Sequence, residues 1–164
     1  MFSIRTILHA TDFSETSDAA FRCAYSLAAD YHAQLVIVHV ASVPVMVGES
    51  LSFFCTEECQ EKLKEELDEL EIPDEHVNVV RRLEQGRPAA EILHLAQLCQ
   101  ADLIVMGSHG RRGLQRFVMG SVADEVVRQA TCPVLTVRAC AWQGKTLLGN
   151  HARSVASWRS KPEV

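Results

Sequence analysis

Five short apolar runs alternate with four amphipathic segments along this chain, and this alternation limits the possible folds more than any other feature of the sequence. The second run, Leu35–Val40, is almost continuously β-branched, as expected for a strand covered on both faces. Strands that alternate with helices form right-handed crossovers and a parallel sheet between two helical layers. We therefore predict an α/β protein with a doubly wound, five-stranded parallel sheet. The expected strands are Ile4–Ala10, Leu35–Val40, His76–Leu83, Asp102–Met106 and Pro133–Val137.

The segments between these runs carry helix signals. Ser14 is the predicted N-cap of a helix that extends to about His32. Pro88 suits the start of the third helix, and Ser121 the start of the fourth, which extends to Ala130. The apolar face of the first helix is expected to contain Ala20, Ala24, Leu27, Ala28 and Tyr31. Residues 41–52, which include a proline and a glycine, are predicted to form a loop.

Composition and charge exclude several classes of protein. A chain of 164 residues with 48% apolar and 23% charged residues fits one globular domain. No window approaches the ~18 uncharged apolar residues of a membrane span, and no signal peptide is visible, so we expect a cytoplasmic protein with its six cysteines reduced. The net charge of −5 argues against nucleic acid as a partner. Residues 108–128 nevertheless carry four arginines against two acids, which favours a small anion there.

Two turns are the best candidates for a ligand site. Ligands of open α/β sheets bind beyond the carboxyl ends of strands, where the strand order reverses. Thr11 and Asp12 follow the first strand, and a glycine-bearing stretch that begins at Gly107 follows the fourth. Gly120-Ser121 opens a helix, where free N–H groups favour phosphate. Ser121 also begins an S-x-x-D capping pattern, so it is a candidate N-cap as well.

The spacing Gly107-x2-Gly110-x9-Gly120-Ser121 resembles the nucleotide-binding signature of the universal stress protein family, in its ATP-binding branch. The resemblance covers roughly residues 3–138, so we expect a nucleotide-binding domain over 1–138 and a flexible C-terminal tail over 139–164. It implies a Rossmann-like sheet with strand order 3-2-1-4-5. Other segments that look like family sequence are Thr11–Ser14, His39-Val40, Gly86-x-Pro88, Ala101–Gly107 and Cys132–Leu135.

The resemblance also implies roles for individual residues. Asp12 would bind the ribose hydroxyls, the adenine would lie near Ala10, Thr11 and Val40, and the phosphates would lie over Gly120–Val122. Mg²⁺ or Mn²⁺ would bridge the phosphates, with no metal-binding side chain assigned. The full set of predicted nucleotide-binding residues is Ala10, Thr11, Asp12, Val40, Met106, Gly107, His109, Gly110, Arg111, Gly120, Ser121 and Val122.

Plainer interpretations compete with these roles. Asp12 is also a common turn residue, and Arg111 an ordinary solvated loop residue. His109 is interpreted as a solvent-facing loop histidine, and His39 as a hydrogen-bonded core histidine. Cys55 and Cys59 lie on an apolar stripe, so packing explains them without a metal. Residues 139–146 approximate a P-loop, but an alanine replaces its first glycine, and we reject that site.

Three functions follow from the pattern. The favoured hypothesis is a cytoplasmic, ATP-binding stress-response regulator without catalytic residues, hydrolysing ATP slowly at most. The alternatives are a true ATPase or nucleotidyl transferase, and a stress-response interaction protein that binds no nucleotide. We also expect a homodimer through the edge strand Pro133–Arg138, because its apolar interior lacks the charges that usually protect an edge. The competing expectation is that the tail covers this strand and keeps the chain monomeric.

Overall fold

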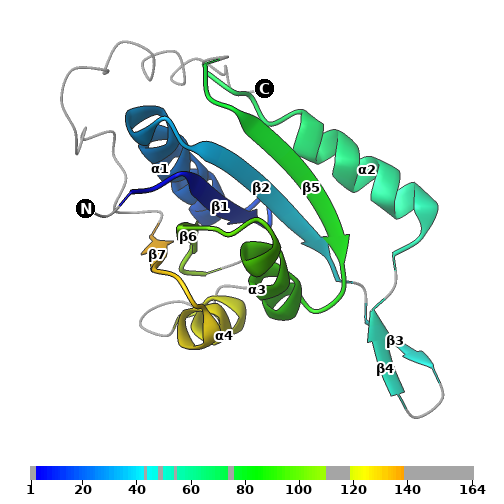
Figure 1. The fold of residues 1–164 in the computed structure, drawn as a ribbon. Helices are drawn as coiled ribbons and strands as arrows, with labels where there is room; N and C mark the ends of the chain where they lie inside the picture. Colours follow the sequence, from blue (N-terminus) through cyan, green and yellow to red (C-terminus); the bar gives the residue numbers. More distant parts are fainter. Residues whose placement is uncertain are drawn as a thin grey trace.

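Five parallel strands form the main sheet of the computed structural model, in the order β5-β2-β1-β6-β7 (Figure 1). When only the strands of the main sheet are numbered in chain order, this is the predicted order 3-2-1-4-5. The structure describes residues 3–42, 44–47, 50–53, 55–73, 76–109 and 119–138. The five strands are β1 (Thr6–Thr11), β2 (Gln34–Ala41), β5 (Val79–Gln85), β6 (Leu103–Gly107) and β7 (Val134–Val137). The tail and its P-loop-like segment lie outside the described residues.

Two helical layers bury the two faces of this sheet. Helices α1 (Glu15–Tyr31) and α2 (Glu57–Asp68) cover one face, which contributes Ile7, Ile37 and Val105 to the first core. Helices α3 (Pro88–Leu98) and α4 (Ser121–Gln129) cover the other face, which contributes Leu8 and Ile104 to the second core. The double coverage explains why the central strands are apolar at nearly every position rather than at alternate ones.

The N-cap of α1 is the predicted one, and the predicted apolar face is largely correct. Ser14 Oγ accepts a hydrogen bond from the backbone N–H of Ser17, 3.2 Å away. The alanines of the predicted face are buried, but Tyr31 is 49% exposed, so its assignment to that face is wrong. Tyr31 is the last residue of the helix, and the C-cap His32 that follows it has a left-handed φ of 52°.

The predicted loop over residues 41–52 is wrong. A two-stranded antiparallel sheet, β3 (Pro44–Val47) and β4 (Ser50–Phe53), occupies most of it and stands apart from the main sheet in Figure 1. Proline is tolerated at the first residue of a strand, and Pro44 is the first residue of β3. Val47 pairs with Ser50, and a two-residue connection of this kind is the commonest in hairpins.

Other differences concern element boundaries. The third strand of the main sheet begins at Val79 rather than His76, because β5 lies at the sheet edge and is only half-buried. Helix α2 begins after an N-cap at Thr56, so Cys55 precedes the helix instead of lying on it. Pro88 occupies the start of α3 as predicted. Within the described part of the chain, none of the helices has the length and apolar character needed to span a bilayer.

Candidate functional site

The candidate site lies at the carboxyl edge of the sheet, where the strand order reverses. From β1 the chain continues outward to β2 and β5 on one side, and β6 and β7 lie on the other. Ala10 pairs with Met106, and Thr11 pairs with His39. This register brings the turns that follow β1 and β6 to one edge, together with Val40. Such a switch point is the usual ligand position in open α/β sheets.

The turn after β1 is built by its own side chains. Thr11 Oγ1 accepts hydrogen bonds from the Phe13 N–H (3.1 Å) and the Ser17 hydroxyl (2.9 Å). Asp12 Oδ1 accepts from the Ser14 N–H (3.2 Å) and the Ser14 hydroxyl (2.6 Å). Phe13 adopts a φ of 60°, a left-handed conformation that these bonds support. The plainer interpretation of Asp12 as a turn residue therefore holds, and its carboxylate is held half-buried at the candidate site.

His39 supports this turn from the neighbouring strand. Its Nδ1 donates to the Thr11 carbonyl oxygen at 2.8 Å, which requires the proton on Nδ1 because a carbonyl can only accept. Its ring contacts the Phe13 ring, with centroids 4.6 Å apart. The prediction of a hydrogen-bonded core histidine is confirmed, and this histidine fixes the backbone just before Asp12.

A second histidine lies deeper on β1, beneath the turn. The His9 side chain is fully buried, and its Nδ1 donates to the Val105 carbonyl oxygen at 3.0 Å. Its Nε2 has no hydrogen-bond partner among the described residues. Loss of hydration on burial lowers the pKa of His9 from 6.5 to about 4, against smaller opposing effects of the Val105 bond and the Asp12 charge. His9 is therefore neutral at physiological pH.

Gly107 is the last residue of β6 and lies close to the first turn of α1. A Cβ at this position would lie 3.1 Å from Thr16 Cγ2 and 3.2 Å from both the Ser17 nitrogen and the His109 carbonyl oxygen. Such contacts are tighter than a well-packed interior allows without movement of the neighbours. Packing of strand against helix thus supplies a reason for glycine here that is independent of any ligand.

Ser108 joins β6, β7 and the start of α4. Its backbone N–H donates to Val137 O, and its carbonyl oxygen accepts from the Gly120 N–H, both at 2.8 Å. Its buried hydroxyl lies 3.0 Å from His109 Nδ1. His109 is half-buried with a solvent-inaccessible Nε2, so the interpretation as a solvent-facing residue is wrong. The reason is that its ring turns back toward the buried Ser108 hydroxyl. The sequence analysis assigned no role to Ser108, which lies between the motif residues Gly107 and Gly110.

The amino end of α4 differs from its prediction. Gly120 is the N-cap, and its carbonyl oxygen accepts from the Asp124 N–H at 2.9 Å. Ser121 is the first helical residue, so the proposed S-x-x-D cap with Asp124 is one position out of register and wrong. No side-chain cap is formed, and the Asp124 carboxylate pairs with Arg128 instead. Because no side chain caps the first turn of α4, its N–H groups are available to bind an anion. A phosphate site needs such N–H donors.

Ten of the twelve predicted nucleotide-binding residues lie in the described part of the chain, and Gly110 and Arg111 lie outside it. The parallel pairing of β1 with β6 and the bond from Gly120 to Ser108 bring the predicted turns to one edge. Their contacts with a nucleotide remain predictions. Among the described residues, no group of three or more metal-ligating side chains is present.

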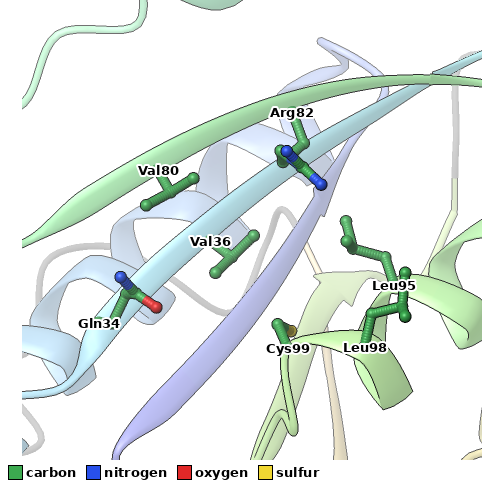
Figure 2. A pocket seen from close by; sticks show the side chains of 7 residues that line it. All are labelled: Gln34, Val36, Val80, Arg82, Leu95, Leu98 and Cys99. Carbon is green, nitrogen blue, oxygen red and sulfur yellow. The ribbon is translucent and has the colours of Figure 1, made fainter.

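A shallow pocket elsewhere does not coincide with this site. It lies between α3 and the amino-terminal halves of β2 and β5, and its side chains are shown in Figure 2. The lining residues are Gln34, Val36, Val80, Arg82, Leu95, Leu98 and Cys99.

Asp102 lies near the same amino-terminal edge and accepts from the backbone N–H groups of Arg5 (2.8 Å) and Thr6 (3.0 Å), which lowers the pKa of its carboxyl group. Sequence reasoning missed this structural role.

Comparison with known proteins identifies the family. Residues 3–138 match the model of the universal stress protein family. Universal stress protein MJ0531 of Methanocaldococcus jannaschii is 36% identical over 141 residues, covering 82% of each chain. The solved structure of MJ0577, from the same organism, gives a TM-score of 0.65 at 27% identity and covers 82% of this chain and 96% of that one.

Two further solved structures share the fold at lower identity. A universal stress protein in complex with cAMP has a TM-score of 0.63 at 24% identity and covers 84% of this chain and 98% of that one. The protein from Archaeoglobus fulgidus in complex with dAMP has a TM-score of 0.60 at 23% identity and covers 84% and 99%. The family match over residues 3–138 and the 36% identity to MJ0531 show that the chain belongs to the universal stress protein family.

Proposed function

We propose that this chain binds an adenine nucleotide, ATP, at the carboxyl edge of β1 and β6 and acts as a nucleotide-dependent regulator of the stress response in the cytoplasm. The observation that carries the proposal is the amino end of α4. It has no side-chain cap, and the Gly120 N–H bond to Ser108 holds it at the end of β6. Two proteins of the same fold are solved in complex with cAMP and dAMP, which supports an adenine nucleotide as the ligand class.

The phosphates would bind at the first turn of α4. The N–H groups of Ser121 and Val122 point along the helix axis toward its amino end, where the helix dipole is positive. The exposed Ser121 side chain adds a hydroxyl donor. Mg²⁺ or Mn²⁺ would bridge the phosphate oxygens, because adjacent phosphate charges are usually neutralised by a divalent cation.

The ribose would bind beside the turn after β1. Asp12 is already oriented by its hydrogen bonds from Ser14, so little side-chain entropy would be lost when its carboxylate accepts a sugar hydroxyl. Backbone groups near Val40 lie at the same edge, next to the Thr11–His39 pair, and would meet the adenine. In this arrangement the base, the sugar and the phosphates would follow one another across the switch point.

We propose a regulatory rather than a catalytic role, with slow hydrolysis at most. The His109 ring is paired with the Ser108 hydroxyl through Nδ1, and within the described residues no carboxylate is bonded to this ring to orient it as a general base. A multiple-turnover phosphate-release assay separates the two roles. Release of many equivalents of phosphate per chain within minutes would establish an ATPase instead.

We further propose a homodimer through Pro133–Arg138. β7 lies at one end of the main sheet and pairs with β6 alone among the described strands. Leu135 is 37% exposed on this strand. Two-fold antiparallel pairing of two such strands would satisfy both edges and close without forming a filament.

The first experiment is mass spectrometry of small molecules released from freshly purified, denatured protein, in which we expect an adenine nucleotide. Titration calorimetry with ATP then compares the wild type with Gly120→Ala and Gly120→Val. The backbone of Gly120 (φ −59°, ψ 148°) suits any residue, so both variants should fold. The valine side chain would occupy the space where phosphate meets α4 and weaken binding by at least about tenfold, or roughly 1.4 kcal/mol, with alanine intermediate. Wild-type affinity in Gly120→Val would refute the phosphate site.

A further inference from the structure

An ion pair links the start of α3 to α4 on the second face of the sheet. Arg87 Nη2 donates to Glu125 Oε1 at 3.1 Å and to Glu125 Oε2 at 3.4 Å. The two helices pack against each other, and both begin at the carboxyl edge of the sheet because they follow β5 and β6 (Figure 1). The Arg128–Asp124 pair lies within α4, whereas the Arg87–Glu125 pair joins two helices that β6 separates along the chain. Another helix therefore supplies a cation to α4.

The guanidinium group of Arg87 lies about one helical turn from the proposed phosphate site. Glu125 follows Ser121 by four residues in α4, so the two side chains share a face of the helix. Their Cβ atoms are about 5–6 Å apart, and helical side chains lean toward the amino end. The Glu125 carboxylate and the guanidinium bound to it therefore lie toward the first turn, where the phosphates are proposed to bind.

Arg87 combines a fixed backbone with an exposed side chain. Its carbonyl oxygen accepts from the Glu91 N–H at 3.0 Å, and Pro88 restricts the next backbone position at the start of α3. The side chain of Arg87 is 62% exposed, and that of Glu125 is 31% exposed. Exposed ion pairs contribute little to stability, so an incoming anion can displace the carboxylate at small cost.

The outer phosphates of a nucleotide are a stronger partner for this arginine than Glu125 is. A carboxylate carries one negative charge, whereas a triphosphate carries several, and the planar guanidinium group binds phosphate oxygens in pairs. Asp12 leads into α1 on the first face, while Arg87 belongs to the second face. A nucleotide with its ribose at Asp12 therefore extends its outer phosphates across the amino end of α4 toward Arg87.

We propose that Arg87 leaves Glu125 and binds the outer phosphates of ATP, so that this residue distinguishes a triphosphate from a monophosphate. The inference rests on the nucleotide-binding function proposed above and adds a residue that recognises the number of phosphates. The exchange releases the Glu125 carboxylate and changes the charge pattern of the exposed α3–α4 surface with the nucleotide state. A nucleotide-dependent regulator needs such a change where a partner can contact it.

Titration calorimetry with Mg²⁺-ATP and with AMP tests the proposal on the full chain. Arg87→Gln should weaken ATP binding by about five- to tenfold and AMP binding by less than about twofold, because only the outer phosphates reach Arg87. Arg87→Lys keeps the charge and should recover part of the ATP affinity. The matched control is Arg82→Gln, which removes another exposed, ion-paired arginine, on β5, and should bind ATP like the wild type. Circular dichroism checks that each variant folds.

Glu125→Gln separates phosphate binding from a structural role. This variant breaks the same ion pair but keeps the arginine, so it should bind ATP at least as tightly as the wild type. If Arg87 only ties α3 to α4, Glu125→Gln should weaken ATP binding as Arg87→Gln does, and that result would overturn the proposal. Wild-type ATP affinity in Arg87→Gln, or equal losses for ATP and AMP, would also overturn it, while binding that still depends on Gly120 would leave the proposed function intact. A wild type that binds no ATP would refute both.

Discussion

The buried histidine of β1 makes the stability of this fold sensitive to acid. His9 has a pKa lowered to about 4 in the folded chain, while an unfolded chain has the ordinary value of 6.5. Below about pH 6.5 the unfolded state therefore binds a proton that the folded state rejects. The free energy of unfolding is largest above the unfolded value and falls as the pH drops toward about 4. Acidification should thus destabilise the protein through this one side chain.

The size of the effect follows from the two pKa values. Each pKa unit corresponds to about 1.4 kcal/mol, so the full loss below pH 4 is about 3 kcal/mol. Between about pH 7.5 and about pH 4.5 the free energy of unfolding should fall by most of this amount, about 2–3 kcal/mol. That amount is a large fraction of the roughly 5–15 kcal/mol by which domains are stable. His9 is fully buried, so solvent screening does not reduce this loss of stability.

Urea unfolding at these two pH values measures the effect. His9→Gln keeps a polar side chain of similar volume but cannot titrate, so it should lose about 2–3 kcal/mol less stability than the wild type on acidification. The matched control, His94→Gln, removes a histidine from an exposed position of α3. The comparison between variants matters because the chain has seven histidines. Equal acid losses in the wild type and His9→Gln would refute the reasoning.

Three further substitutions test the helix start, the ribose contact and the sheet edge. Ser14→Ala should cost about 1 kcal/mol in urea unfolding because it removes the α1 cap, whereas Ser121→Ala, which removes no cap, should cost clearly less. In calorimetry, Asp12→Ala should weaken the binding of ATP more than it weakens the binding of 2′,3′-dideoxy-ATP, and Asp12→Asn is the control that keeps an acceptor for the turn. Equal losses of affinity for the two nucleotides would leave Asp12 as a turn residue only. Thr136→Lys should shift light scattering from dimer toward monomer, and a monomeric wild type that dimerises after truncation at Arg138 would show that the tail covers β7.

The central strands were predictable because burial on both faces demands apolar side chains at nearly every position. In β2, all residues after Gln34 are buried, and the run Leu35–Val40 marks the strand directly. The edge strand β5 lacks this signal. Arg81 in its middle donates to the carbonyl oxygens of Leu67 (3.0 Å) and Leu70 (2.8 Å) at the end of α2. Because such polar side chains interrupt the apolar pattern of an edge strand, the sequence did not predict the first residue of β5 correctly.

Local sequence could not decide which residue begins α4. Serine is a good N-cap, and the capping pattern with Asp124 favours Ser121 on local grounds. The structure places the cap at Gly120 because the Gly120 N–H bonds to the carbonyl oxygen of Ser108, a contact between the ends of two elements twelve residues apart. The single proline of residues 41–52 misled in the same way, since Pro44 occupies the first position of β3, where a strand tolerates proline.

Two helices begin at the same edge of the sheet, and their differences indicate where a phosphate would bind. Ser14 Oγ already accepts from the first turn of α1, and Glu15 adds negative charge there. At α4 the N-cap is Gly120, which offers no side-chain acceptor, and the acid of the first turn, Asp124, is paired with Arg128. At α1 an anion would compete with the Ser14 hydroxyl for the N–H groups and would be repelled by the Glu15 carboxylate. At α4 it would bind N–H groups, and the nearby Asp124 carboxylate is paired with Arg128. The phosphates are therefore expected over α4, and Asp12 at the start of α1 is left to the uncharged sugar, where a carboxylate acceptor binds without repulsion.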